Sequence, residues 1–331
     1  MKPKIAFIGT GGTISSIGRH SLDIVDYVAN GVMLHAGDIV ARYPELAEVA
    51  EVIPVRFRNV PSFDIFFAEW QELVRLCDRL VAEIPDLAGI VIGHGTASLE
   101  ETAWALNLTV KVPVPVVVVG AQRPPSALSS DAGMNLVNAV RTAAAPESRG
   151  RGVLVVLNDE IQAARDVTKT STFRMQTFRS PDFGALGHAD GDRIAYYRRA
   201  ERRAAPETEF DIRTLAALPR VDITYAYTGS DGTAVRAFVA AGAKGIVSAG
   251  FAPGFPGSAD NAALEEAVRQ GVVVVQSTRA GSGRTFRGER FRRGGILIAD
   301  NLNPQKARIL LALALTVTTD PAEIERIFTT Y

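Results

Sequence analysis

Short runs of β-branched residues alternate with helical patterns along most of this 331-residue chain. The clearest runs in the first half are Ile5–Ile8, Gly89–Ile92, Val114–Val119 and Val153–Leu157. The run at Val114–Val119 is apolar throughout, as expected for a strand whose two faces are both covered. Strands that alternate with helices are typical of a mostly parallel sheet flanked by helices. The chain is therefore predicted to have an α/β fold, with helices at about Phe66–Ile84, Leu99–Leu106 and Asn135–Ala144.

A polar stretch rich in arginine and glutamate, residues 197–219, separates this pattern from a second α/β pattern. We therefore expect a larger N-terminal domain at 1–196, a connection at 197–219 and a smaller C-terminal domain of flavodoxin-like or Rossmann-like type at 220–331. A last helix is expected to begin near Pro304, with Asn303 as its N-cap. The other elements predicted for the C-terminal domain are Val221–Tyr225, Thr233–Ala241, Gly245–Ser248, Ala262–Gln270 and Val272–Gln276.

Composition excludes several classes of function. The 36 basic residues balance the 36 acidic residues, so no global field attracts the protein to nucleic acid or to anionic membranes. No apolar run approaches the roughly 20 residues that span a bilayer, and the short run after the N-terminus is typical of a strand rather than a secretion signal. We therefore expect a cytoplasmic protein that binds neither nucleic acid nor membrane. Cys77, the only cysteine, is predicted to be buried and structural.

The first motif that could carry chemistry is the glycine-rich turn Gly9–Ile14, directly after the first strand. Glycines there allow a sharp turn and let a ligand approach the backbone amides. A dinucleotide fingerprint requires glycine where Ile14 stands, and a P-loop requires a Gly-Lys-Ser/Thr that is absent. We therefore expect no nucleotide cofactor, and the histidines lack the spacing of metal ligands. What remains is either a plain tight turn or one that presents the hydroxyls of Thr10 and Thr13 to a ligand.

Two further motifs follow later strands. His94-Gly95-Thr96-Ala97-Ser98 comes directly after Gly89–Ile92, and Arg165-Asp166-Val167-Thr168-Lys169-Thr170 comes after Val153–Leu157. The first brings hydroxyls to the carboxyl end of a strand, where open α/β sheets bind ligands. A lysine in a partly desolvated cleft loses its proton more readily and can then act as a base for a hydroxyl nucleophile. Alone, the first of these motifs is no stronger a sign of function than the glycine-rich turn, and His94 is better explained as a hydrogen-bonded core histidine. The second motif alone is better explained as a solvated charged loop.

In their order and spacing, these motifs resemble those of the bacterial L-asparaginases, especially the type II asparaginase and glutaminase-asparaginase group. Two more segments support the resemblance, Val-Gly-Ala-Gln-Arg-Pro with Ser-Asp-Ala-Gly-Met-Asn-Leu, and Leu-Asn-Pro-Gln-Lys-Ala-Arg near the C-terminus. The similarity extends from Ile5 to Tyr331. It implies a hydrolase of linear amides that forms a homotetramer, a dimer of dimers, with sites at the interfaces between subunits.

The resemblance also implies a role for individual residues. The threonine that matches Thr13 attacks the side-chain amide carbonyl, and an acyl-enzyme is then hydrolysed. The residues that match Thr96 and Lys169 form a second polar relay, and Tyr27 is the only tyrosine in the loop whose tyrosine assists the nucleophile. The residue that matches Ser62 binds the substrate α-carboxylate. Gly12, Gly95, Phe63 and Ala97 adjoin these residues and are expected to line the substrate pocket.

The chain departs from the family pattern where that pattern binds the substrate ammonium. The aspartate after the second-motif threonine is replaced by Ala97, the glutamine after the serine by Phe63, and a C-terminal asparagine by Pro253. Glu289 is a candidate for the neighbouring subunit's acidic residue. Asp131 and Asp166 are candidates for the carboxylate that Lys169 has lost. Glu100 and Glu101 are interpreted as residues of a helix first turn, where the helix dipole stabilises them.

These losses predict a pocket for a substrate whose α-position is uncharged, larger or N-substituted, because a buried ammonium without partners is costly. Compensation by other residues, with asparagine kept as substrate, is the alternative. Two further hypotheses stay open. The same nucleophile would also serve a hydrolase of a cyclic imide, lactam, lactone or ester. A catalytically silent ligand-binding protein would need neither the threonines nor the lysine. A basic stretch at Arg284, Arg287, Arg290, Arg292 and Arg293 is interpreted as surface or intersubunit charge.

Overall fold

The computed structural model describes all residues from Met1 to Tyr331. The chain forms two compact units, Met1–Arg213 and Thr214–Tyr331. The predicted bounds of the connection, 197–219, stay a prediction. No helix is both long enough and apolar enough to cross a membrane.

The first unit is built on an eight-stranded sheet in the order β12-β11-β8-β7-β6-β5-β1-β4. Five neighbouring strands, β4 to β7 across β1, run parallel, whereas β8, β11 and β12 are antiparallel. The predicted α/β fold with a mostly parallel sheet is confirmed. The strands are β1 (Lys4–Gly9), β4 (Glu51–Arg56), β5 (Leu87–Gly93), β6 (Val116–Val119), β7 (Val153–Leu157), β8 (Glu160–Ala163), β11 (Gly187–Ala189) and β12 (Ile194–Tyr196).

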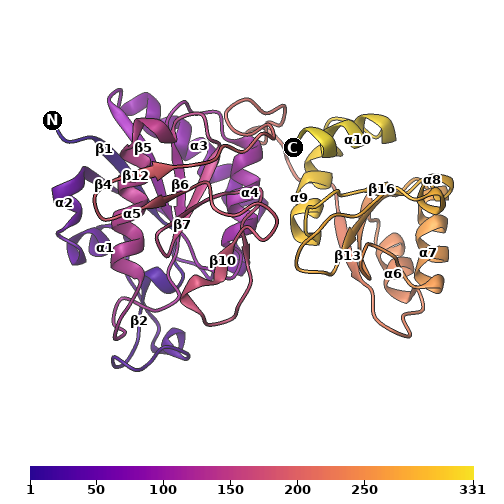
Figure 1. Cartoon of the computed structure of the whole chain (residues 1–331), viewed down its shortest axis with the longest axis horizontal. Helices are drawn as coiled ribbons and strands as arrows, with labels where there is room; N and C mark the ends of the chain where they lie inside the picture. Colours follow the sequence, from indigo (N-terminus) through magenta and orange to yellow (C-terminus); the bar gives the residue numbers. More distant parts are fainter. The chain divides into compact units, whose positions relative to one another are not determined.

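Helices cover both faces of this sheet, which explains why β6 and β7 are apolar at every position (Figure 1). On one face α1 (Ala36–Arg42), α2 (Leu46–Val49) and α5 (Ala132–Ala144) enclose a core that includes Ile5 and Phe7 of β1. On the other face lie α3 (Phe67–Glu83) and α4 (Leu99–Thr109). A buried hydrogen bond joins these two helices, in which Trp70 Nε1 donates to Thr102 Oγ1 over 3.0 Å.

Helix α5 begins three residues before the predicted Asn135, and the reason is a packed glycine. A Cβ on Gly133 would lie 2.8 Å from Cε1 of Tyr43. The glycine therefore permits close packing against the Tyr43 ring and does not mark the helix start.

Short elements complete the first unit around the glycine-rich turns. They are η1 (Thr13–Ser15), β2 (Ser16–Ile17), η2 (Tyr27–Asn30), β3 (Val32–Met33), η3 (Ser62–Asp64), η4 (Pro146–Ser148), β9 (Thr168–Lys169), η5 (Met175–Thr177) and β10 (Phe178–Arg179). Two antiparallel pairs, β2 with β3 and β9 with β10, lie outside the main sheet.

The second unit has a four-stranded parallel sheet in the order β13-β14-β15-β16. Its elements are β13 (Val221–Tyr225), α6 (Thr233–Ala240), β14 (Gly245–Gly250), α7 (Ser258–Arg269), β15 (Val273–Thr278), α8 (Glu289–Gly294), β16 (Leu297–Ile298), α9 (Pro304–Ala314) and α10 (Pro321–Thr330). Asn303 caps α9 by accepting a hydrogen bond from the Lys306 amide. The sequence predicted that α9 would be the last helix of the chain, and this prediction was wrong. A further helix begins at Pro321, because Asp320 and Pro321 supply a second N-cap and first turn.

Candidate active site

Two of the sequence motifs meet at the carboxyl edge of the larger sheet. Strands β1 and β5 are parallel neighbours, and Gly9 lies opposite Gly93 at their ends. Thr10 joins the two turns, because its backbone amide and its Oγ1 both donate to the Gly93 carbonyl, at 3.0 and 2.9 Å. Thr10 is fully buried by this contact. Of the two hydroxyls in the first motif, one is therefore structural, and Thr13 is left to meet a ligand.

The glycines of the two motifs contact each other backbone to backbone. A Cβ on Gly12 would lie 2.1 Å from the Gly95 Cα atom, and the φ angle of Gly12 is +83°. Both facts exclude a side chain there, since L-residues rarely adopt this backbone conformation. A Cβ on Gly95 would in turn lie 2.8 Å from the Oγ of Ser62. Gly12, Gly95 and Ser62 thus form one tightly packed floor of the site.

Thr13 lies against a tyrosine from the loop that follows. Its Oγ1 is 2.7 Å from the Tyr27 hydroxyl, and the threonine is 8% exposed. Tyr27 is the half-buried first residue of η2. The loop that carries it is anchored to a distant segment, because the Gly18 amide donates to Ser126 Oγ and the Leu128 amide donates to the Ser21 carbonyl. Either hydroxyl can donate, so the pair can carry a proton in both directions.

Thr96 forms a second polar pair with a lysine. Lys169 Nζ donates to Thr96 Oγ1 over 2.8 Å, from the two-stranded ribbon of β9 and β10. Thr96 is 6% exposed and Lys169 is half-buried. Burial lowers the pKa of the Lys169 ammonium, and the charge of Glu100 opposes this shift by raising it. Desolvation is the larger effect, so the neutral amine is more accessible than in an exposed lysine.

Glu100 is the carboxylate whose charge raises the pKa of Lys169. The sequence placed it only in the first turn of a helix. Asp131 accepts the backbone amides of Gln122 and Arg123, and Asp166 pairs with Arg165 at 3.0 Å. The two aspartates proposed as substitutes are therefore used elsewhere. The structure buries Glu100 in a helix where only Glu101 is less buried, and the sequence did not show this burial. A buried charge calls for a partner.

The residues expected to bind the substrate differ strongly in exposure. Ser62 is 4% exposed, and its carbonyl accepts a 2.5 Å hydrogen bond from Ser98 Oγ. The next residue, Phe63, is 73% exposed, and Ala97 beside Thr96 is also exposed. The two positions that replace ammonium-binding side chains therefore present a benzyl group and a methyl group at the surface of the site.

The candidates from the C-terminal region lie in the second unit. Glu289 pairs with Arg293 at 3.0 Å, and Arg287 forms an ion pair with Glu325. Pro253 follows strand β14 in a turn closed by bridging of Phe251 with Phe255. No group of three or more His, Cys, Asp or Glu side chains is arranged to hold a metal ion. Cys77 is fully buried, and burial raises the pKa of its thiol to about 12.

A threonine–tyrosine hydroxyl pair and a half-buried lysine with a lowered pKa therefore lie at the carboxyl edge of a mostly parallel sheet, where α/β proteins bind ligands. Comparison with known proteins identifies the family. The model of the N-terminal domain of asparaginases matches residues 4–202, and that of the glutaminase/asparaginase C-terminal domain matches residues 220–328.

Relatives of known name match over nearly the whole chain. L-asparaginase 2 of Bacillus subtilis is 41% identical, with 99% of this chain and 87% of the relative covered. A probable periplasmic L-asparaginase of Haemophilus influenzae is 40% identical over 98% of this chain and 92% of the relative. The crystal structure of a probable cytoplasmic L-asparaginase from Campylobacter jejuni superposes with a TM-score of 0.94, at 36% identity and full coverage of both chains. The chain belongs to the L-asparaginase family and is a hydrolase of carbon–nitrogen bonds in linear amides.

His94, between the two polar pairs in sequence, is a neutral structural residue. It is fully buried, and its Nδ1 lies 2.8 Å from the Gly95 carbonyl, so Nδ1 carries the hydrogen. Burial lowers the pKa of the imidazole to about 4. Below about pH 6.5 the unfolded chain therefore binds a proton that the folded chain does not bind. Stability is lost as the pH falls from about 6.5 to about 4.

We predict that this histidine costs the protein about 3 kcal/mol of unfolding free energy by pH 4, since each pKa unit corresponds to about 1.4 kcal/mol. Urea unfolding of the wild type and of His94→Gln at several pH values measures the effect. The glutamine does not titrate, so the free energy of unfolding of the wild type should fall more steeply than that of the variant as the pH falls. Parallel pH curves for both proteins would contradict the assignment.

Proposed function

We propose that the chain hydrolyses a carboxamide through an acyl-enzyme on Thr13, and that its preferred substrate lacks a free α-ammonium. The proposal rests on two hydrogen-bonded pairs of polar side chains. They lie beside an apolar surface where the substituents on the α-carbon of the substrate would bind. Thr13 contacts Tyr27 and Lys169 contacts Thr96, whereas Phe63 and Ala97 offer nothing to a cation.

In the first half-reaction, Thr13 Oγ1 attacks the amide carbonyl carbon. The carbon–oxygen bond forms, the carbon–nitrogen bond breaks and ammonia leaves with the proton that Thr13 gives up. A threonine hydroxyl is a weak nucleophile and needs a proton acceptor. The Tyr27 oxygen, 2.7 Å from Oγ1, lies in hydrogen-bond reach of that proton. We assign stabilisation of the oxyanion to main-chain amides of the glycine turns at Gly12 and Gly95, where no side chain covers the backbone.

In the second half-reaction, water attacks the threonine ester and the proton returns to Thr13 Oγ1. Lys169 is suited to activate this water, because burial lowers its pKa and Thr96 Oγ1 lies 2.8 Å from its Nζ. The neutral amine of Lys169 takes a proton from this water, and the hydroxyl of Thr96 orients the amine. The ester bond breaks, and the product leaves as a carboxylate.

The α-substituents of the substrate meet two different surfaces. Ser62, buried beside Gly95, is the residue we assign to the substrate carboxylate. Nothing charged stands at 63 or 97 to balance an ammonium. Leaving a buried charge without its partner costs about 3–5 kcal/mol, and each 1.4 kcal/mol is about tenfold in affinity. Asparagine would thus bind hundreds of times more weakly than in a site with both partners, whereas an uncharged or N-acylated analogue would lose nothing.

We further infer that the protein acts as a homotetramer in the cytoplasm and binds no nucleic acid. The balance of 36 basic and 36 acidic residues supports the last point. The structural neighbour named as a probable cytoplasmic L-asparaginase supports the location, although the relative from Haemophilus influenzae is named as periplasmic. Light scattering of the purified protein measures the oligomeric state.

The substrate assignment predicts that succinamate, which is asparagine without its amine, is hydrolysed with a higher kcat/KM than L-asparagine. N-acetyl-asparagine should also exceed asparagine, because it carries no ammonium and Phe63 offers its acyl group an apolar contact. Ammonia release measures all three, and Thr13→Ala should abolish each activity. A higher kcat/KM for asparagine would overturn the substrate assignment. Turnover that survives Thr13→Ala would overturn the nucleophile.

The role of Lys169 predicts a pH effect of a neighbouring residue. Glu100 raises the lysine pKa, so Glu100→Gln should lower it further. The neutral, active form of the lysine then appears at lower pH, and the rising limb of the kcat profile, which includes hydrolysis of the acyl-enzyme, should move towards acid. Glu101→Gln, in the same helix turn, is the matched control and should leave the limb in place. A limb that moves in both variants, or in neither, contradicts the role given to Lys169.

A further inference from the structure

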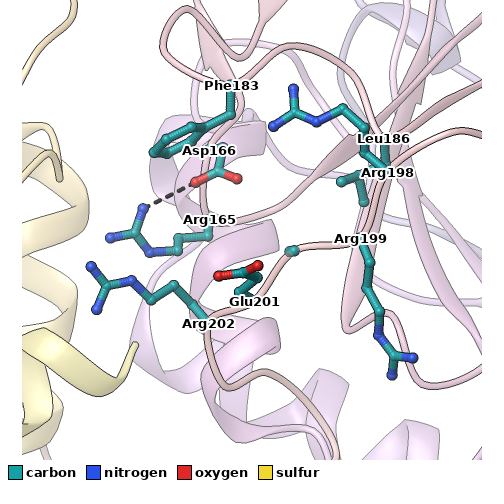
Figure 2. Close-up of a pocket in the computed structure, with 9 residues that line it drawn as sticks. Arg165, Asp166, Phe183, Leu186, Arg198, Arg199, Glu201 and Arg202 are labelled. Atoms are coloured by element: carbon teal, nitrogen blue, oxygen red, sulfur yellow. Dashed lines mark hydrogen bonds and ion pairs between the residues drawn. The ribbon is translucent and has the colours of Figure 1, made fainter.

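A cavity of about 420 Å³ lies in the first unit, apart from the residues assigned to the active site. One wall is the loop after β10 that carries Phe183 and Leu186, and the other is the segment from Arg198 to Arg202 (Figure 2). Arg165 and Asp166 lie between them. None of these residues takes part in the Thr13 or Lys169 contacts.

The backbone of both walls is fixed by hydrogen bonds. Leu186 donates to the Ile161 carbonyl of β8, and its own carbonyl accepts the amides of Tyr197 and Arg198 at 2.9 and 3.1 Å. The turn that presents Phe183 is closed by bonds from Phe183 and Gly184 to the Ser180 carbonyl. The cavity is therefore a preformed feature of the fold, as small-molecule sites usually are.

Positive charge predominates around the cavity. Four arginines, at positions 165, 198, 199 and 202, meet two carboxylates, at Asp166 and Glu201. The inner pair is nearly neutral, because Arg165 donates to Asp166 at 3.0 Å and their side chains are only 5% and 12% exposed. Figure 2 shows this pair beneath the loop of Phe183, with Arg198 and Arg202 on separate sides of the opening. The excess charge thus resides in the arginines of the segment 198–202.

Arg198 is the clearest cation available to a ligand. Its guanidinium makes no hydrogen bond or ion pair with the protein, although its backbone is held by Leu186. Arg199 uses one guanidinium nitrogen on the Gly150 carbonyl at 3.3 Å. A guanidinium held next to an apolar surface matches an oxyanion that is attached to an apolar group. Phe183, 43% exposed, and Leu186 supply that apolar surface.

We propose that this cavity binds a small organic anion, with its carboxylate or phosphate on Arg198 and its apolar part against Phe183 and Leu186. The volume suits a small molecule, since such sites usually span about 300–1,000 Å³. A polyanion is disfavoured, because the chain as a whole carries no excess of basic residues. The site is independent of turnover, so it stands or fails separately from the proposed function.

Isothermal titration calorimetry with benzoate and phenyl phosphate tests the proposal, with acetate and inorganic phosphate as probes that lack the apolar part. The wild type should bind the aromatic probes more tightly than their small counterparts, and the tighter of the two identifies the oxyanion. Binding should weaken by about tenfold or more in Arg198→Gln, since a lost charge-assisted contact is strong. Arg193→Gln removes an exposed arginine from the turn between β11 and β12 and should change nothing.

A second variant separates the two halves of the site. Phe183→Ala should remove the preference for the aromatic probes while inorganic phosphate binds as before. Binding that is equal in the wild type and in Arg198→Gln would overturn the proposal, as would equal loss in Arg193→Gln. The absence of millimolar binding by any probe to the wild type would also overturn it. Thermal unfolding of each variant, compared with the wild type, shows that the fold is retained.

Discussion

The contact between Gly12 and Gly95 is the constraint on which the rest of the site depends. Two turns at the ends of neighbouring strands can share one position only if neither carries a side chain where they touch. The Gly12 backbone, with a φ of +83°, is also one that other residues rarely adopt. Because the turns meet at this point, Thr13 and Thr96 belong to one site although they are 83 residues apart in sequence. Thr10 reinforces the contact through its two hydrogen bonds to Gly93.

Burial at this edge of the sheet then decides which groups carry charge. The same desolvation that keeps His94 neutral also makes the neutral form of Lys169 accessible. The difference lies in their partners. The Nδ1 of His94 meets a backbone carbonyl, whereas Lys169 meets the hydroxyl of Thr96 and the charge of Glu100. His94 is therefore inert, whereas Lys169 is suited to proton transfer. His94 lies directly after β5, and Lys169 lies in the segment after β8.

The sequence predicted the central parallel strands of the first unit, because continuous apolar runs report burial on both faces, and Val153–Leu157 matches β7 residue for residue. It missed the parallel edge strand β4, which carries Glu51, Pro54 and Arg56. The antiparallel strands β8, β11 and β12 were missed, since they are three or four residues long and include polar residues such as Glu160 and Gln162. At the site, the motifs identified residues that the fold brings into contact. The partnership of Glu100 with Lys169 was not visible, because it depends on how helix α4 is placed against the ribbon of β9.

The central claim is that Thr13, not Thr96, forms the covalent intermediate. Rapid acid quenching during turnover, followed by peptide mass spectrometry, tests it most directly, because an ester on threonine survives at low pH. We expect an acyl adduct on the peptide that contains Thr13, absent from Thr13→Ala and absent without substrate. An adduct on the Thr96 peptide would contradict the role of Thr13 as nucleophile and exchange the roles of the two threonines.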